Sequence, residues 1–178
     1  MVIISVLTGC SSENRPLSDA VHFREALLSS GGCSFCADIT ADYGDSLTQF
    51  SMSCQADDQG EVTFEVTEPV SIAGICGTIS DRGGSIQFDG QSLYFPLLTD
   101  DLLTPASAPW IFLKTLRSGY ISSACMEDGL LHMTVDDDYE EDALTLDIWM
   151  EENRPVRADI LHDGKRILSV QVENFMLL

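Results

Sequence analysis

Most of this chain alternates between apolar and polar residues in short runs, and that alternation limits the folds it can adopt. In the clearest run, residues 61–67, Val62, Phe64 and Val66 are separated by charged or hydroxyl side chains. Successive side chains of a β-strand point to opposite faces, so this period of two predicts a strand with one apolar and one solvated face. Similar runs recur after Phe35, separated by short turns rich in Gly and Asp. We therefore expect about 10 or 11 strands in an antiparallel meander.

Two stretches have helical spacing instead. Apolar residues recur three and four positions apart in residues 17–30, where Ser18 or Asp19 can cap the first turn. A second helix is expected over about 106–118, after Pro105. A sheet of this many strands does not stay flat. The predicted fold class is therefore α+β, with a curved antiparallel sheet, an unclosed β-barrel, wrapped over an N-terminal helix and a central helix.

The segment between these patterns is harder to interpret. Val70 to Ser80 is longer and more uniformly apolar than the other runs, and we expect one extended strand in which Gly74 and Gly77 mark bends. Gly83-Gly84 is expected to turn the chain into the next strand, and the strong turn signal Asp89-Gly90 follows.

The N-terminal sequence Leu7-Thr8-Gly9-Cys10 follows an apolar run and resembles the lipobox of bacterial lipoproteins. In that family the cysteine carries lipid and the preceding peptide is removed. The resemblance implies a signal peptide remnant at 1–9, lipid attachment at Cys10, a lipidated tether at 10–16 and a single domain at 17–178. It also implies an extracytoplasmic protein anchored to the cell membrane. The alternative is a chance occurrence of these four residues.

Charge excludes one class of partner. The chain has 29 Asp and Glu residues against 9 Lys and Arg, for a formal net charge of -20. Nucleic acid requires a basic surface, so no nucleic-acid partner is expected. The acidic stretch 136–142 offers carboxylates suited to calcium, but it lacks the alternating ligands and central glycine of an EF-hand loop. We interpret it as a solvated hairpin loop and predict no metal and no cofactor.

Five cysteines remain after Cys10. Cys33 and Cys36 form a C-x-x-C pair, which permits redox or metal chemistry, but the chain has no second such pair for zinc. We favour thiols in a loop that leads into a strand. A disulfide is permitted outside the cytoplasm, and the spacing defines no pairing.

The sequence contains no convincing catalytic constellation. Its three histidines, His22, His132 and His162, have no sequence-local partners for a triad. Carboxylates are too abundant here for paired acids to be informative. We therefore predict that the protein is not an enzyme.

The whole layout after the tether resembles the LolA/LolB-type lipoprotein carriers, including LolA-like lipoproteins of clostridia and related Gram-positive bacteria, some of which serve in spore germination. The resemblance rests on the early helix, the central Pro-bearing helix and three turn regions, which are Ala41-Asp42-Tyr43-Gly44-Asp45, Phe88-Asp89-Gly90-Gln91-Ser92-Leu93 and Asp163-Gly164. In those carriers the concave apolar face of the half-barrel shelters acyl chains.

The resemblance implies a lipid or other apolar ligand on the concave face. The candidate residues for that face are Phe64, Val66, Ile72, Phe88, Leu93, Phe95, Trp110 and Ile148. The alternative for these positions is a filled core between sheet and helices. A second functional hypothesis is a regulatory module that docks on a cell-wall or sporulation/germination enzyme through a strand at the open edge.

Overall fold

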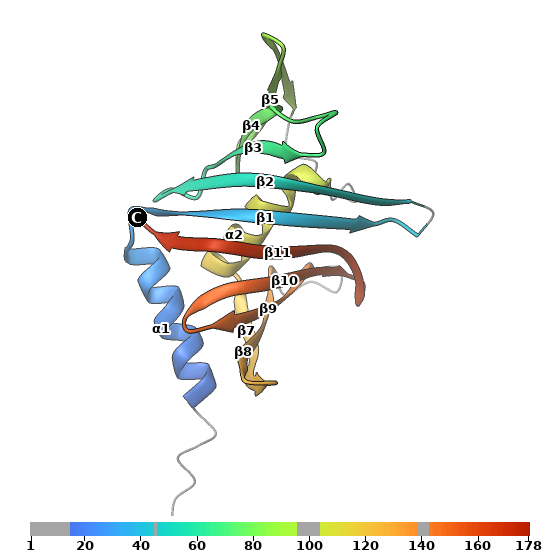
Figure 1. Cartoon of the computed structure of the whole chain (residues 1–178). Coiled ribbons are helices and arrows are strands. Elements are labelled where there is room, and N and C mark those ends of the chain that lie inside the picture. Colours follow the sequence, from blue (N-terminus) through green and yellow to red (C-terminus); the bar gives the residue numbers. More distant parts are fainter. Residues whose placement is uncertain (1–14, 45, 96–103, 139–142) are drawn as a thin grey trace, which may run out of the picture.

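The computed structural model describes residues 15–44, 46–95, 104–138 and 143–178 (Figure 1). Its elements, in chain order, are α1 (Arg15–Ser29), β1 (Gly32–Asp42), β2 (Leu47–Asp57), β3 (Val62–Glu68), β4 (Cys76–Ser80), β5 (Gly83–Phe88), β6 (Gln91–Phe95), the 3-10 turn η1 (Pro105–Ser107), α2 (Ala108–Ser118), β7 (Tyr120–Glu127), β8 (Leu130–Asp136), β9 (Thr145–Glu151), β10 (Arg154–His162) and β11 (Lys165–Leu177). Cys10, with the expected signal remnant and most of the tether, lies outside these residues. So does most of the acidic loop.

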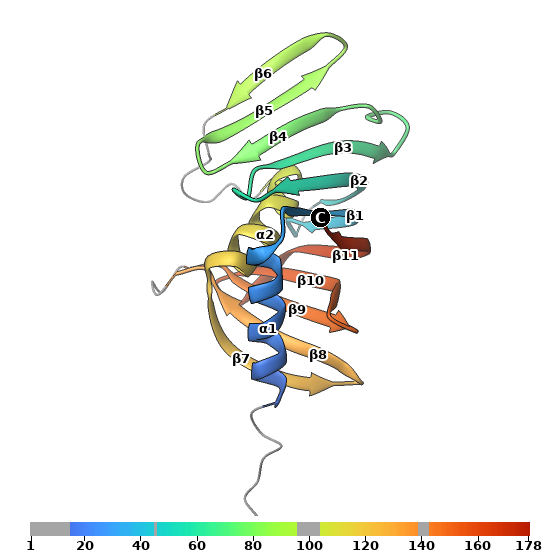
Figure 2. The same cartoon turned by 90° about the vertical axis from the view of Figure 1, so that its left-hand side faces the viewer.

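All the strands described belong to one antiparallel sheet, in the order β6-β5-β4-β3-β2-β1-β11-β10-β9-β8-β7. The first and last strands of the chain pair at its centre, for example through Ile39 and Val170. From this pair, two meanders run outward to the edges β6 and β7 (Figure 2). The sheet is curved and does not close, which confirms the expected fold class and the number of strands.

Tight two-residue turns set the register of several hairpins. At Asp89-Gly90, Asp128-Gly129 and Asp163-Gly164, both central residues have positive φ, for example 49° and 73° at the first. This is the pattern of a type I′ turn, whose twist matches that of paired strands and which favours Asp or Asn followed by Gly. The Asp-Gly signals in the sequence therefore mark real hairpins.

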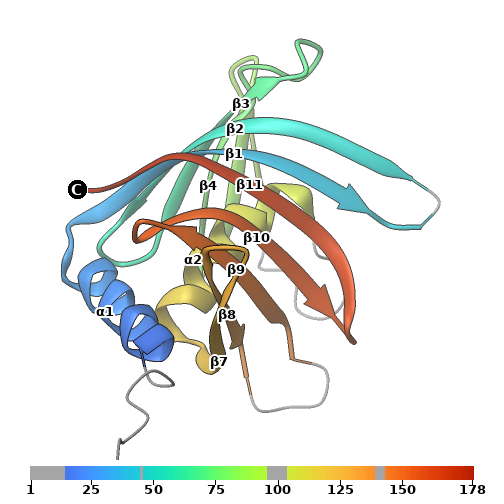
Figure 3. The same ribbon diagram turned by 60° about the horizontal axis from the view of Figure 1, so that its bottom comes forward.

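Both helices lie on the concave side of the sheet (Figure 3). The chain leaves β6 at one edge and enters β7 at the other, so the segment between them must cross the sheet, and α2 is part of this crossing. On α2, Ile111, Phe112 and Leu116 are buried against the strands. The position of α2 therefore decides which part of the concave face is covered.

Aromatic rings connect the two helices to the central strands. Phe23 of α1 contacts Phe175 of β11, with ring centroids 6.0 Å apart. Phe35 of β1 contacts Phe175 at 6.1 Å and Phe112 of α2 at 5.8 Å. In addition, Nε of Arg24 donates a 2.8 Å hydrogen bond to the carbonyl of Leu116 at the end of α2. Sheet and helices thus share one continuous core.

Three local expectations are wrong. The segment 70–80 is not one strand: the amide of Ile72 bonds to the carbonyl of Pro69 and that of Gly74 to Val66, so the chain turns before the short strand β4 begins. The turn between β4 and β5 is at 81–82, and Gly83-Gly84 already belongs to β5. The C-x-x-C cysteines lie within β1 itself, where Cys33 is buried and Cys36 exposed.

The helix boundaries also differ slightly from the expectation. α1 begins at Arg15, so Ser18 and Asp19 lie inside the helix and do not cap it. The central helix begins at Ala108, and Pro105 belongs to the 3-10 turn in front of it. Both helices nevertheless lie where the periodicity predicts them.

Candidate ligand-binding face

A row of concave-face positions runs from the core out to the edge strand. Phe64 of β3 is opposite Gly77 of β4, Gly77 is opposite Ile86 of β5, and Ile86 is opposite Leu93 of β6. Phe64 is buried, Ile86 is half-buried and Leu93 is 66 % exposed. Phe88, two residues beyond Ile86 and on the same face, is 51 % exposed. The concave face is therefore apolar beyond the reach of α2, and there its side chains are uncovered.

Gly77 has a specific role in this row. A Cβ atom added at Gly77 would lie 2.6 Å from the ring of Phe64 and 2.5 Å from the carbonyl oxygen of Ser85. The absent side chain allows the Phe64 ring to lie directly over β4. The core continues to Ile79 of β4, which is 1 % exposed, and Ile86 and Leu93 extend the apolar face outward across β5 and β6.

The structure does not bring the eight predicted cavity residues together. Phe64, Val66 and Ile148 are buried in the core, and Ile148 lies on β9 in the other half of the sheet. Ile72 and Trp110 are half-buried, whereas Phe88 and Leu93 are exposed. The side chain of Phe95 lies outside the part of the chain that the structure describes. Ile86 was missed, although its alternation with Phe88 and its position in the 83–88 run could have identified it.

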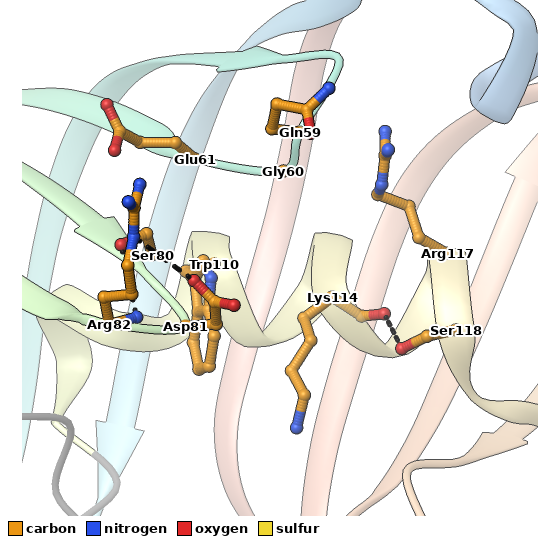
Figure 4. Close-up of a pocket in the computed structure, with 10 residues that line it drawn as sticks. All are labelled: Gln59, Gly60, Glu61, Ser80, Asp81, Arg82, Trp110, Lys114, Arg117 and Ser118. Carbon is orange, nitrogen blue, oxygen red and sulfur yellow. Dashed lines mark hydrogen bonds and ion pairs between the residues drawn. The ribbon is translucent and has the colours of Figure 1, made fainter.

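A pocket of about 200 Å³ lies at the rim of this face, between α2 and two hairpin turns (Figure 4). The residues that line it are Gln59, Gly60 and Glu61 from the β2–β3 connection, Ser80 at the end of β4, Asp81 and Arg82 from the β4–β5 turn, and Trp110, Lys114, Arg117 and Ser118 from α2. Lys114 lies four positions after Trp110, and Arg117 and Ser118 lie three and four positions after Lys114, which places the four residues on one side of α2. That spacing is the signal by which the sequence could have revealed the pocket.

Three of the nine Lys and Arg residues of this acidic chain line the pocket. Arg117 donates a 2.6 Å hydrogen bond to the carbonyl of Asp58 and so fastens the β2–β3 turn to α2. Lys114 is paired with Asp137 at 2.9 Å and points away from Arg82 and Arg117 (Figure 4). Glu61 and Asp81 offset much of the remaining positive charge, so the pocket is polar rather than strongly basic.

The outer face of the sheet carries a stack of planar side chains. The imidazole of His132 stacks on the indole of Trp149 with ring centroids 4.6 Å apart, and the guanidinium of Arg157 lies 4.5 Å from the indole centroid. These residues are directly opposite one another on β8, β9 and β10, so the sheet register builds the stack. Cation–π contacts of this kind stabilise by about 0.5–1 kcal/mol when exposed.

In the same cluster, a histidine lies between a cysteine and an aspartate. The Sγ atom of Cys125 is 3.9 Å from Nδ1 of His132, and Nε2 of His132 is 3.3 Å from a carboxylate oxygen of Asp147. However, the carboxylate of Glu127 is 3.3 Å from the same Nδ1 atom, closer than the thiol. A base whose nitrogen is already held by a carboxylate is poorly placed to activate a thiol.

The other two histidines lie elsewhere in the fold. His22 is exposed on α1, and His162 lies at the end of β10 beside a turn. Across the described ranges, no group of three or more His, Cys, Asp or Glu side chains is arranged to hold a metal ion. Neither α1 nor α2 has the length and apolar character needed to span a membrane.

Solved structures with low sequence identity resemble this architecture. A DUF1329 family protein from Desulfovibrio piger is 11 % identical, with a TM-score of 0.51 and 91 % of each chain covered. An uncharacterized conserved protein from Thermus thermophilus is 14 % identical, with a TM-score of 0.50 and coverage of 92 % of this chain and 88 % of that chain. The LolA superfamily protein NE2245 from Nitrosomonas europaea is 10 % identical, with a TM-score of 0.47 and coverage of 89 % and 93 %. The first two of these likenesses show the fold, a curved and unclosed antiparallel sheet with two helices on its concave side.

Likeness at these identities concerns the fold alone. No protein-family model matches the chain, and no curated protein matches it. These comparisons therefore indicate neither a ligand nor a site.

Proposed function

We propose that this protein is a non-catalytic, membrane-anchored envelope lipoprotein that binds a lipid or acyl chain on the uncovered part of its concave face. The observation that carries the proposal is the exposure of Phe88 and Leu93 on a face whose other apolar positions form the core. A contiguous apolar surface of this kind in a water-soluble domain is typical of a binding site.

The size of the neighbouring pocket indicates how such a ligand would lie. A volume of about 200 Å³ is at or below the lower end of the range for small-molecule sites, so the pocket does not enclose a long acyl chain. A chain lying along β5 and β6 would cover Phe88 and Leu93 and would gain about 1 kcal/mol from each half-exposed side chain. Trp110 and Arg82, at the rim, would then contact the more polar end of the ligand.

Membrane anchoring in this proposal depends on lipid at Cys10. The supporting observation is the Leu7-Thr8-Gly9-Cys10 sequence that precedes the folded domain. Two or three acyl chains hold a protein on a bilayer stably, because each buried CH₂ contributes about 0.8 kcal/mol. The protein would then act on the outer side of the cell membrane.

Two aspartate substitutions and a matched control test the ligand site. We expect Phe88→Asp and Leu93→Asp each to weaken binding of a fluorescent long-chain fatty acid at least tenfold, because a carboxylate opposes an apolar chain at that position. Val70→Asp is the control, since Val70 is also apolar and is 90 % exposed but lies outside this row. Equal affinity in all three variants and the unchanged protein would refute the proposed site.

A protein partner is the second candidate function, and one observation favours it. Among the strands that the structure describes, β6 is at the end of the sheet and pairs with β5 alone, and Gln91–Phe95 contains no charged residue. Natural edge strands are usually blocked by charge, proline or a bulge, and the other edge strand, β7, does have a bulge near Ser123. A regulatory role on a cell-wall or sporulation/germination enzyme would use this edge. Such a partner would bind the Phe88→Asp variant normally, whereas an apolar ligand would not.

A further inference from the structure

Helix α1 leaves an apolar stripe exposed beside its buried face. The buried face packs on the core through Phe23 and its neighbours. Leu17, Val21 and Leu28 are four and seven positions apart, which places them along one side of the helix, and they are 40–51 % exposed. Apolar exposure repeated at helical spacing is different from single apolar residues scattered over a surface.

The end of β11 extends this stripe. The amide of Gly31 donates a 2.9 Å hydrogen bond to the carbonyl of Leu178, and the amide of Leu178 donates a 3.0 Å hydrogen bond to the carbonyl of Gly32. These bonds hold Leu177 and Leu178, both more than a third exposed, next to the end of α1. Figure 2 shows α1 and the C-terminal end of the chain on the same side of the molecule.

We propose that this surface, formed by Leu17, Val21, Leu28, Leu177 and Leu178 and called here the α1 face, rests on the lipid bilayer. The inference rests on the lipid anchor of the proposed function. Five residue steps separate Cys10 from Arg15, where α1 begins, and they span at most about 18 Å. A lipid on Cys10 would therefore keep the start of α1 close to the membrane surface.

The energies suit a contact that needs the anchor. Covering four or five half-exposed leucine and valine side chains gives only a weak contact, with a dissociation constant of about 1 mM. Alone, this is too weak to hold the protein on a membrane. A short tether raises the effective concentration to the millimolar range, so the anchored protein would spend a large part of its time with the α1 face on the bilayer.

The net charge of -20 determines which lipid suits this contact. Anionic lipids would repel the domain, so the α1 face fits a zwitterionic surface through apolar contact alone. In this orientation the axis of α1 would lie along the bilayer surface rather than project from it. Amphipathic helices that bind membranes commonly lie in the interface in this way.

Tryptophan quenching in vesicles tests the orientation. The full chain, expressed in a bacterium that lipidates it, is reconstituted in phosphatidylcholine vesicles with or without bromine on the acyl chains. We expect the emission added by Leu28→Trp or Leu178→Trp to fall by at least a third in brominated vesicles. The emission added by the control Val70→Trp should stay unchanged, and the signal of Trp110 and Trp149 is subtracted using the parent chain.

The mass of the Cys10 peptide separates the two claims. A lipidated chain in which Leu28→Trp and Leu178→Trp are both quenched no more than Val70→Trp would overturn the orientation and leave the anchor in place. A chain with unmodified Cys10 would overturn the anchor and with it this inference. Two quenching positions are used so that poor folding of one variant does not decide the result.

Discussion

Asp159 is a carboxylate that the fold buries on the outer side of β10. It is 6 % exposed and accepts bonds from Nε and Nη2 of Arg157, from Arg166 at 3.4 Å and from the hydroxyl of Ser169 at 2.7 Å. Its two oxygens are therefore fully used. A buried charge with several donors is costly to break, because the partners lose their counter-charge.

We predict that Asp159→Asn lowers the free energy of unfolding by about 2–4 kcal/mol, measured by urea denaturation. The amide removes the charge and replaces an acceptor with a donor that faces the two arginines. Asp38→Asn, on the exposed side of β1, is the matched control and should change stability by less than about 0.5 kcal/mol. Similar values for the two variants would contradict the role assigned to Asp159.

Buried thiols make stability depend on pH at alkaline values. Burial raises the pKa of Cys33 from 9.0 to about 11, against the opposing effect of Arg117. Burial also raises the pKa of Cys54, and the nearby Cys36 and Cys33 thiols act in the same direction. Below pH 9 each thiol is protonated in both the folded and the unfolded protein. Above pH 9 the unfolded chain ionises first, so stability falls as pH rises toward 11.

The expected loss is at most about 1.4 kcal/mol per pH unit for each thiol. Cys33→Ala should reduce the slope of unfolding free energy against pH between 9 and 11, whereas Cys125→Ala, at an exposed site, should not. An unchanged slope in Cys33→Ala would contradict the assignment.

In the folded protein, the exposed Cys36 and Cys125 should react with iodoacetamide before Cys33 and Cys54.

The packing of the short strand β4 depends on Gly77, which has no side chain. Gly77→Ala would place a Cβ atom 2.6 Å from the Phe64 ring and 2.5 Å from a backbone oxygen of β5, so both must shift. We predict a loss of about 1–3 kcal/mol in thermal or urea unfolding. Thr78→Ala, next in the same strand, is the control and should cost less. Equal stability of Gly77→Ala and the unchanged protein would mean that the Phe64 ring is free to move.

Elements were predictable where local chemistry decides them. The alternation in 61–67 and the Asp-Gly turns fix strands and hairpins through neighbouring residues alone, and they agree with the structure. The segment 70–80 was not predictable in the same way, because its apolar residues fit both a strand and a turn. Backbone hydrogen bonds to the carbonyls of Pro69 and Val66 favour the turn over the strand. These bonds leave no periodic pattern in the sequence.

The candidate site depends on the whole molecule and was therefore only partly predictable. Phe64 and Leu93 have the same pattern in the sequence, yet one is buried and the other exposed. The difference arises because α2 covers one part of the concave face and leaves the β5–β6 part open. The path of α2 follows from the position of β6 and β7 at opposite edges, which is a property of sheet order rather than of any local pattern.

At the scale of the molecule, we propose that the open part of the concave face holds an apolar ligand. Native mass spectrometry of residues 11–178, purified from cells without detergent, tests it most directly. We expect a reproducible additional mass that dissociates as a lipid or fatty acid and that is lost in Leu93→Asp but kept in Val70→Asp. A ligand-free mass for the unchanged protein, or an adduct that Leu93→Asp retains in full, would contradict it.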